Sequence, residues 1–163
     1  MPSPEPVSAR QVFSSPVLLL AFGFGTGLSP IAPGTVGTAA AIPLFLMIEP
    51  LSPAVYWVVT GVLLLVGFWI CGASNRVLPN RDHAGIVWDE MTGFLIAMGF
   101  TRAEWSWIGL GFLLFRFFDI IKLWPASLID RRFHGGFGIM LDDAVAGLYT
   151  MLVLNAVTMW VEG

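Results

Sequence analysis

Long apolar stretches separated by short polar loops dominate the chain. Nearly uninterrupted apolar windows cover residues 54–72, 86–100, 105–124 and 139–161. A helix that crosses a bilayer takes about 20 residues, so these windows predict helices of spanning or nearly spanning length. Because continuous apolar stretches of this length are untypical of strands, the expected fold is all-α, a polytopic membrane helical bundle.

The N-terminal part follows a different pattern. Two apolar halves, residues 16–28 and 35–48, are separated by a break at residues 29–34 that is rich in Gly, Pro and Ser. Each half is too short to span alone, so we expect a broken or re-entrant N-terminal helix that makes one net crossing. Irregular backbone at membrane depth is tolerated only where it is buried in protein or lines a polar cavity, so the break predicts a cavity.

Composition supports a membrane setting for the segment after the first 15 residues. The chain is 56% hydrophobic and 12% charged, against about 25% charged for soluble domains. Residues 1–15 hold four Ser and three Pro and are expected to form a disordered tail, which leaves residues 16–163 as a single membrane-embedded domain.

A net charge of −3 argues against nucleic-acid binding. The lone Cys71 excludes an intramolecular disulfide and a multi-thiolate metal site.

The distribution of arginine predicts the orientation of these helices. Cytoplasmic loops of membrane proteins are enriched in Lys and Arg. Three segments meet this criterion, and they carry Arg10, Arg76 with Arg81, and Arg131 with Arg132. The turns at residues 49–53 and 101–104 and the C-terminus have no such excess, so we expect them on the opposite side of the membrane.

Seven charged residues fall inside apolar windows, where each costs about 2.5 to 3.5 kcal/mol at the centre of a spanning helix. They are Asp89, Glu90, Arg116, Asp119, Lys122, Asp142 and Asp143. A long side chain such as that of Lys122 can instead snorkel to the interface, an alternative that short Asp side chains lack. All of these positions lie near the loops expected on the cytoplasmic side, so we expect the charges to converge at one membrane face.

Two adjacent acidic pairs predict a divalent metal site. They are Asp89 with Glu90 and Asp142 with Asp143. Neighbouring carboxylates cannot all ionise at low dielectric without a cation between them. Because the ligands are all oxygens, and the two histidines of the chain are not spaced as in a zinc motif, Mg²⁺ or Mn²⁺ is favoured over zinc.

Cationic and glycine-rich positions add a phosphate-binding character. Arg116, Asp119 and Lys122 recur every three residues, which places them on one stripe of a helix. Enzymes that act on phosphate esters commonly use Mg²⁺ with nearby Arg and Lys side chains to stabilise the phosphoryl group. In the break, Gly34 would let the backbone approach an anion, and Thr35 would cap the following helix, whose positive end would face a phosphate.

The glycines leave two interpretations open. Gly23 and Gly27 form a small-xxx-small pair that would serve close helix packing as well as ligand binding. His134 begins the stretch His-Gly-Gly-Phe-Gly, which is either only a flexible loop or the carrier of a titrating proton donor.

Four sequence blocks, in order, resemble the phosphatidylglycerophosphatase A family. They are FGFGTGLSPIAPGTVG (22–37), VWDE (87–90), FRFFDIIKLWP (115–125) and, after Asp130, HGGFGIMLDD (134–143). Together they extend over most of the chain. Leu123 departs from the family pattern, which has Pro in a Lys-Pro-Trp-Pro stretch. The absence of this Pro removes a signal for a local backbone kink but removes none of the charged residues.

The resemblance implies a Mg²⁺-dependent lipid phosphatase of the bacterial inner membrane, with its active site facing the cytoplasm, that converts phosphatidylglycerophosphate to phosphatidylglycerol. The expected metal ligands are Asp89, Glu90, Asp142 and Asp143. Catalytic roles are expected for Asp119, Asp143 and His134, and phosphate binding for Arg116, Lys122, Thr35 and Gly34. Spacing leaves open whether water or a carboxylate attacks phosphorus.

A membrane transporter is the alternative function. Intramembrane charges around a broken helix also suit an ion- or proton-coupled carrier. That hypothesis predicts charges near mid-membrane and an internal repeat, whereas this sequence clusters its charges toward one face and shows no repeat.

Overall fold

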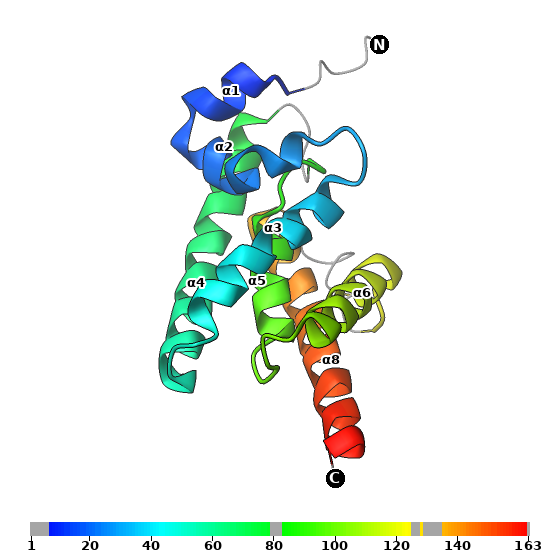
Figure 1. Cartoon of the computed structure of the whole chain (residues 1–163). Helices are drawn as coiled ribbons and strands as arrows, with labels where there is room; N and C mark the ends of the chain where they lie inside the picture. The colour runs from blue at the N-terminus through cyan, green and yellow to red at the C-terminus, as the bar shows by residue number, and fades with distance from the viewer. Residues whose placement is uncertain (1–6, 79–82, 125–127, 129–134, 163) are drawn as a thin grey trace.

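The computed structural model describes residues 7–78, 83–124, 128 and 135–162, and every regular element in this part of the chain is helical (Figure 1). The all-α prediction is confirmed for these residues. The elements are α1 (Ala9–Ser14), α2 (Pro16–Ala21), the 3-10 helix η1 (Gly23–Leu28), α3 (Pro33–Ile48), α4 (Pro53–Val77), α5 (Trp88–Ala97), α6 (Trp105–Ile121) and α8 (Gly136–Glu162).

Two of the described helices, α4 and α8, are long and apolar enough to cross a membrane. The start of α4 is encoded locally: Ser52 accepts a hydrogen bond from the Val55 N–H, and Pro53 occupies the first turn. Proline is preorganised for that position because its fixed φ is helical and its missing N–H would have no partner there.

The window at residues 86–100 was expected to approach spanning length, and this prediction is wrong. Its helix, α5, has 10 residues, or about 15 Å against a hydrocarbon core of about 30 Å. The helix starts late because the Val87 N–H donates to the Ala21 carbonyl at 2.8 Å, which holds the preceding backbone against α2. Nine of its ten residues are buried, and it packs against α3, α4, α6 and α8. The apolar window therefore reflects burial in protein.

The N-terminal region needs one correction. Residues 9–14, expected in a disordered tail, form α1. The Ser8 side chain accepts from the Gln11 N–H while the Gln11 side chain accepts from the Ser8 N–H, a reciprocal capping box. Val12 anchors the helix in a core cluster with Ile70 of α4. That residues 16–163 form a single domain stays a prediction.

The N-terminal region is interrupted between α2 and α3, and the interruption begins before the expected residues 29–34. After α2, Phe24 and Gly25 adopt positive φ values of 57° and 101°, and Ala32 adopts 47° before α3 begins. That this region makes one net membrane crossing stays a prediction. A Cβ on Gly27 would fall on the carbonyl oxygen of Gly85, so close packing against a loop accounts for this glycine. This close approach places the break beside the loop that leads into α5.

The loops separate into two groups at opposite ends of the helices. Residues of the 49–53 and 98–102 turns share one hollow, whereas the loop before α5 and the residues flanking α6 and α8 share another. The turn at residues 49–53 precedes α4 and Leu78 caps its other end, so the length of α4 separates the two (Figure 1). Which end faces the cytoplasm stays a prediction from the arginine pattern.

Candidate active site

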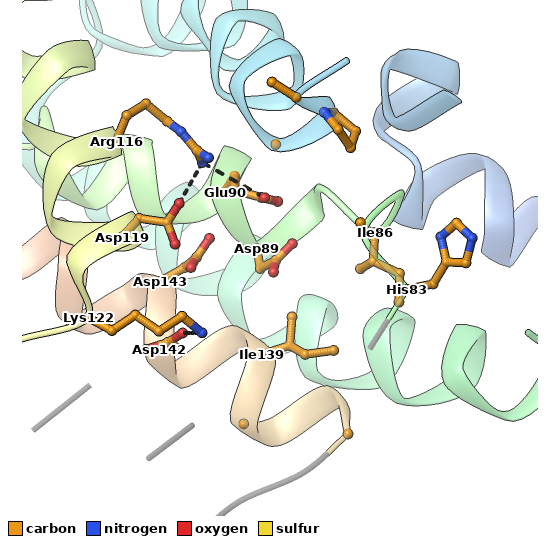
Figure 2. A pocket seen from close by; sticks show the side chains of 16 residues that line it. His83, Ile86, Asp89, Glu90, Arg116, Asp119, Lys122, Ile139, Asp142 and Asp143 are labelled. Atoms are coloured by element: carbon orange, nitrogen blue, oxygen red, sulfur yellow. Dashed lines mark ion pairs between the residues drawn. The ribbon is translucent and has the colours of Figure 1, made fainter. Parts of the chain in front are cut away.

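A cavity of about 350 Å³ lies where the beginnings of α3, α5 and α8 meet the end of α6 (Figure 2). All seven charged residues of the apolar windows line it, as the sequence predicts: Asp89, Glu90, Arg116, Asp119, Lys122, Asp142 and Asp143. Three separate segments contribute these charges. Their convergence makes this cavity the candidate active site.

Helix direction gives the cavity a favourable potential for anions. Gly34 lies in the first turn of α3, Asp89 in the first turn of α5, and Gly138 in the first turn of α8, and all three line the cavity. Unpaired N–H groups and the helix dipole place partial positive charge at each such end. The acidic side chains therefore lie in a frame that also accommodates a phosphate.

The carboxylates form two overlapping groups. One oxygen each from Asp89, Glu90 and Asp143 lie within 4.8 Å of one another, and so do one oxygen each from Asp119, Asp142 and Asp143. Asp143 belongs to both groups, and Figure 2 shows it between Asp119 and Asp89. Each group has the spacing of ligands around one metal ion.

Burial makes these carboxylates costly without a cation. Asp89 is 7% exposed and Asp143 4%. Within the described residues, Asp89 Oδ1, Glu90 Oε2 and Asp143 Oδ2 have no hydrogen-bond partner. Removing a carboxylate from water costs several kcal/mol unless a partner compensates. An all-oxygen, anionic donor set suits a hard divalent cation, so these residues fit a metal site.

The two basic side chains lie against the carboxylates. Arg116 Nη1 is 2.6 Å from Asp119 Oδ2 and 3.9 Å from Glu90 Oε1, and Lys122 Nζ is 2.5 Å from Asp142 Oδ2 (Figure 2). Arg116 Nε is buried and has no acceptor among the described residues. Arg116 therefore keeps a donor for a further anion.

The expected helical stripe ends before Lys122. Helix α6 stops at Ile121, and Lys122 has φ 48°, a left-handed conformation that is uncommon for a residue with a side chain. All three stripe residues, Arg116, Asp119 and Lys122, still reach the cavity.

Of the two positions expected to bind phosphate in the break, only Gly34 lines the cavity. The expected cap at Thr35 is wrong, because α3 begins at Pro33 and its N-cap is Ala32, which makes no side-chain cap. Thr38, one turn further, was missed by the sequence analysis: its hydroxyl donates to the Gly34 carbonyl at 2.8 Å and accepts from Arg116 Nη1 at 3.5 Å. Its only sequence signal was its spacing of four residues from Gly34.

The stretch that follows His134 is helical from Gly136 onward. His134 lies outside the described residues. Gly136 and Gly138, expected in a loop after it, belong instead to the first turn of α8, where a Cβ on Gly136 would meet the backbone of Gly72. A tight contact between helices explains this glycine.

His83, which the sequence analysis did not propose for the site, lines the cavity on the side away from Arg116 and Lys122 (Figure 2). Its Nδ1 accepts the Gly85 N–H at 2.9 Å, and its ring lies 5.6 Å from that of Phe22. Burial lowers the pKa of His83 below its ordinary value, so the neutral ring presents Nε2–H as a donor. In the sequence only its place in the polar loop before α5 could have suggested it.

This helical fold and this pocket define a class: a membrane-associated phosphatase whose site is built from clustered carboxylates flanked by arginine and lysine. The family model described as Phosphatidylglycerophosphatase A matches residues 19–158, and the chain belongs to this family. The predicted resemblance is confirmed.

Three relatives extend this result. The Phosphatidylglycerophosphatase A of Escherichia coli (strain K12) is 42% identical over 147 residues, covering 90% of this chain and 86% of the relative. That of Haemophilus influenzae is 38% identical over 148 residues, covering 90% and 91%. A Bacteroides thetaiotaomicron protein with the provisional name of phosphatidylinositol-3-phosphatase is 35% identical over 153 residues, covering 90% and 95%. No solved structure matches this chain.

Proposed function

We propose that this chain hydrolyses the terminal phosphomonoester of phosphatidylglycerophosphate in the described cavity, releasing phosphatidylglycerol and inorganic phosphate. The observation that carries the proposal is the convergence of all seven charges of the apolar windows on one cavity, in a chain of the Phosphatidylglycerophosphatase A family. The transporter alternative expects charges near mid-membrane. Here Asp89 and Asp142 lie in the early turns of α5 and α8, at one end of the helices.

Substrate phosphate would bind between the basic side chains and the start of α3. Arg116 contributes its Nε–H, Lys122 an ammonium held beside Asp142, and Gly34 a backbone surface without a side chain. Asp119 holds the Arg116 guanidinium at 2.6 Å and so orients it. Such fixed positive groups stabilise the charge that develops on the equatorial oxygens during phosphoryl transfer.

Magnesium is the proposed cofactor, held by Asp89, Glu90, Asp142 and Asp143. When bound, it supplies charge neutralisation and Lewis-acid polarisation of the phosphoryl oxygens. Asp119 and Asp143, which both line the cavity, are the proposed groups for accepting a proton from attacking water or for attacking phosphorus. These remain alternative roles.

The departing glycerol oxygen needs a proton, and His134 is the proposed donor, on its sequence context alone. His83 is proposed to hydrogen-bond the substrate without giving up its proton, because its ring is neutral, its Nδ1 is occupied by the Gly85 N–H and its Nε2–H is left to donate. Its place across the cavity from Arg116 and Lys122 suits the glycerol side of the scissile bond (Figure 2).

Phosphate release from purified protein tests the reaction. In detergent micelles with Mg²⁺, we expect release from phosphatidylglycerophosphate, its loss after chelation by EDTA, and its recovery when Mg²⁺ is restored. Phosphatidylinositol 3-phosphate, offered at the same surface concentration, measures how strictly the head group is selected. Release that is indifferent to EDTA would overturn the metal assignment, and no release from phosphatidylglycerophosphate would overturn the reaction.

The proposed location is the bacterial inner membrane, with several spans and the cavity open to the cytoplasm. The test uses single cysteines in a Cys71→Ala background, because Cys71 is the natural thiol. Val77→Cys and Ala103→Cys place exposed thiols at opposite ends of the helices. With an impermeant maleimide on intact spheroplasts, we expect labelling at residue 103 and protection at residue 77 until the cells are lysed. The reverse pattern would invert the orientation.

A further inference from the structure

We propose that the cavity holds two divalent cations, with the Asp143 carboxylate bridging them. This inference rests on the proposed function, because it concerns the number and arrangement of cations at the same site. Three independent features of the described residues support it: geometry, unpartnered oxygens and charge.

The geometry provides two ligand sets that share one residue. Asp89 and Glu90 come from α5, Asp119 from α6, and Asp142 from α8, and each set closes on Asp143 within 4.8 Å. A carboxylate has two oxygens and commonly bridges two metals, which lie about 3.5 to 4 Å apart in two-metal phosphatase sites. Figure 2 shows the Asp143 side chain between Asp119, from one set, and Asp89, from the other.

Unpartnered oxygens mark the first set as incomplete without a cation. Asp89 Oδ1, Glu90 Oε2 and Asp143 Oδ2 are buried and accept no hydrogen bond within the described part of the chain. In the second set, Asp119 and Asp142 each engage a basic side chain through one oxygen. A carboxylate has about four lone-pair sites, so one ion pair does not exhaust its capacity as a ligand.

The formal charge of the described residues favours two cations over one. Among them, five carboxylates and two basic side chains line the cavity, which gives a formal charge of −3. A phosphomonoester brings about two more negative charges near neutral pH. Before substrate binds, one divalent cation would leave these residues at −1, whereas two cations would bring them to +1, a charge that attracts the phosphate.

The two positions should differ in affinity. In the Asp89, Glu90 and Asp143 set, each residue has one buried oxygen without a hydrogen-bond partner, and the basic contact is a 3.9 Å approach of Arg116 Nη1 to Glu90 Oε1. In the Asp119, Asp142 and Asp143 set, Arg116 and Lys122 already compete for two of the carboxylates. We therefore expect a tight first cation and a weaker second one.

Manganese provides the probe, because Mn²⁺ replaces Mg²⁺ at oxygen sites and is paramagnetic. Metal-free protein in detergent is titrated with Mn²⁺, bound metal is counted by equilibrium dialysis, and low-temperature EPR reports whether two ions are exchange-coupled. We expect two ions per chain at saturation, bound in two steps, with a coupled spectrum. A single ion, or two uncoupled ions, would overturn the bridged pair.

Variants assign the positions. Asp119→Asn should keep the tight ion and lose the second, and Asp143→Asn should abolish coupling. Glu104→Gln, an exposed residue at the start of α6 far from the cavity, should bind as the parent does. Loss of both ions in Asp119→Asn, with an unchanged thermal unfolding profile, would contradict the assignment of two ligand sets.

Phosphate release by the same samples separates this inference from the proposed function. Full activity in protein that binds a single ion at saturation would overturn the second cation and leave the phosphatase standing. Two coupled ions without any hydrolysis of phosphatidylglycerophosphate would overturn the reaction and leave the metal pair standing.

Discussion

Replacing Asp89 with asparagine is expected to lower phosphate release by at least about 100-fold, the loss typical when one electrostatic partner of a transition state is removed. The amide keeps the size of the side chain but loses the charge that holds a hard cation. Asp89 is buried and its Oδ1 has no partner in the described structure. Removing that buried charge relieves a desolvation cost, so the variant should be at least as stable as the parent toward heat.

The measurement combines phosphate release with thermal unfolding of purified Asp89→Asn protein. Glu104→Gln removes an exposed carboxylate outside the cavity and should change neither quantity. Asp142→Asn should lose activity similarly but is a less clean variant, because it also takes an ion-pair partner from Lys122. Near-normal turnover in Asp89→Asn would remove this residue from the site and reopen the transporter hypothesis.

Adding a single methyl group at Gly34 should also abolish most of the activity. Gly34 has helical backbone in α3, so alanine fits the local conformation. Its Cβ, however, would fall on the Glu90 carboxylate and lie 3.2 Å from Arg116 Nη1. Glu90 and Arg116 must then move, and a displacement of about 1 Å at an active site costs on the order of 100-fold in rate.

Gly109→Ala in α6 is the matched control, because a Cβ there meets nothing within 4 Å. Both variants should insert and purify as the parent does, and Gly109→Ala should keep full phosphate release. Failure of Gly34→Ala to fold, with Gly109→Ala folded, would attribute this glycine to packing and not to chemistry. Normal activity in a folded Gly34→Ala protein would show that the start of α3 takes no part in the site.

Hydropathy was sufficient to find α4, α6 and α8, because in each case a long apolar window in the sequence coincides with a long helix. It could not distinguish a spanning helix from α5, whose apolar residues face protein on every side. The Ser-x-x-Gln spacing of the capping box at Ser8 and Gln11 is present in the sequence, but the Ser- and Pro-rich composition around it predicted a disordered tail.

The charged part of the site could be predicted because charge inside an apolar window is expensive and therefore conspicuous. Asp89, Arg116 and Asp142 all reach the cavity as expected. Neutral and loop residues carry no such signal. Thr38 reaches Arg116 because the turn of α3 places it one turn after Gly34. His83 reaches the cavity because its loop is held where Gly85 packs against Gly27. Both depend on tertiary packing.

The contact between α5 and α8 determines how the site responds to the surrounding bilayer. A Cβ at Gly147 would fall on the Gly93 carbonyl, and one at Gly93 would lie 2.8 Å from the Asp143 carbonyl, so the two backbones touch next to the carboxylates. Helices in such contact cannot slide past one another without losing close packing. When lipid chain length changes and α8 adjusts its tilt, α5 must move with it. Asp89, Glu90 and Asp143 then travel as one rigid unit, and turnover should be insensitive to bilayer thickness even though one helix of the pair is long enough to span it.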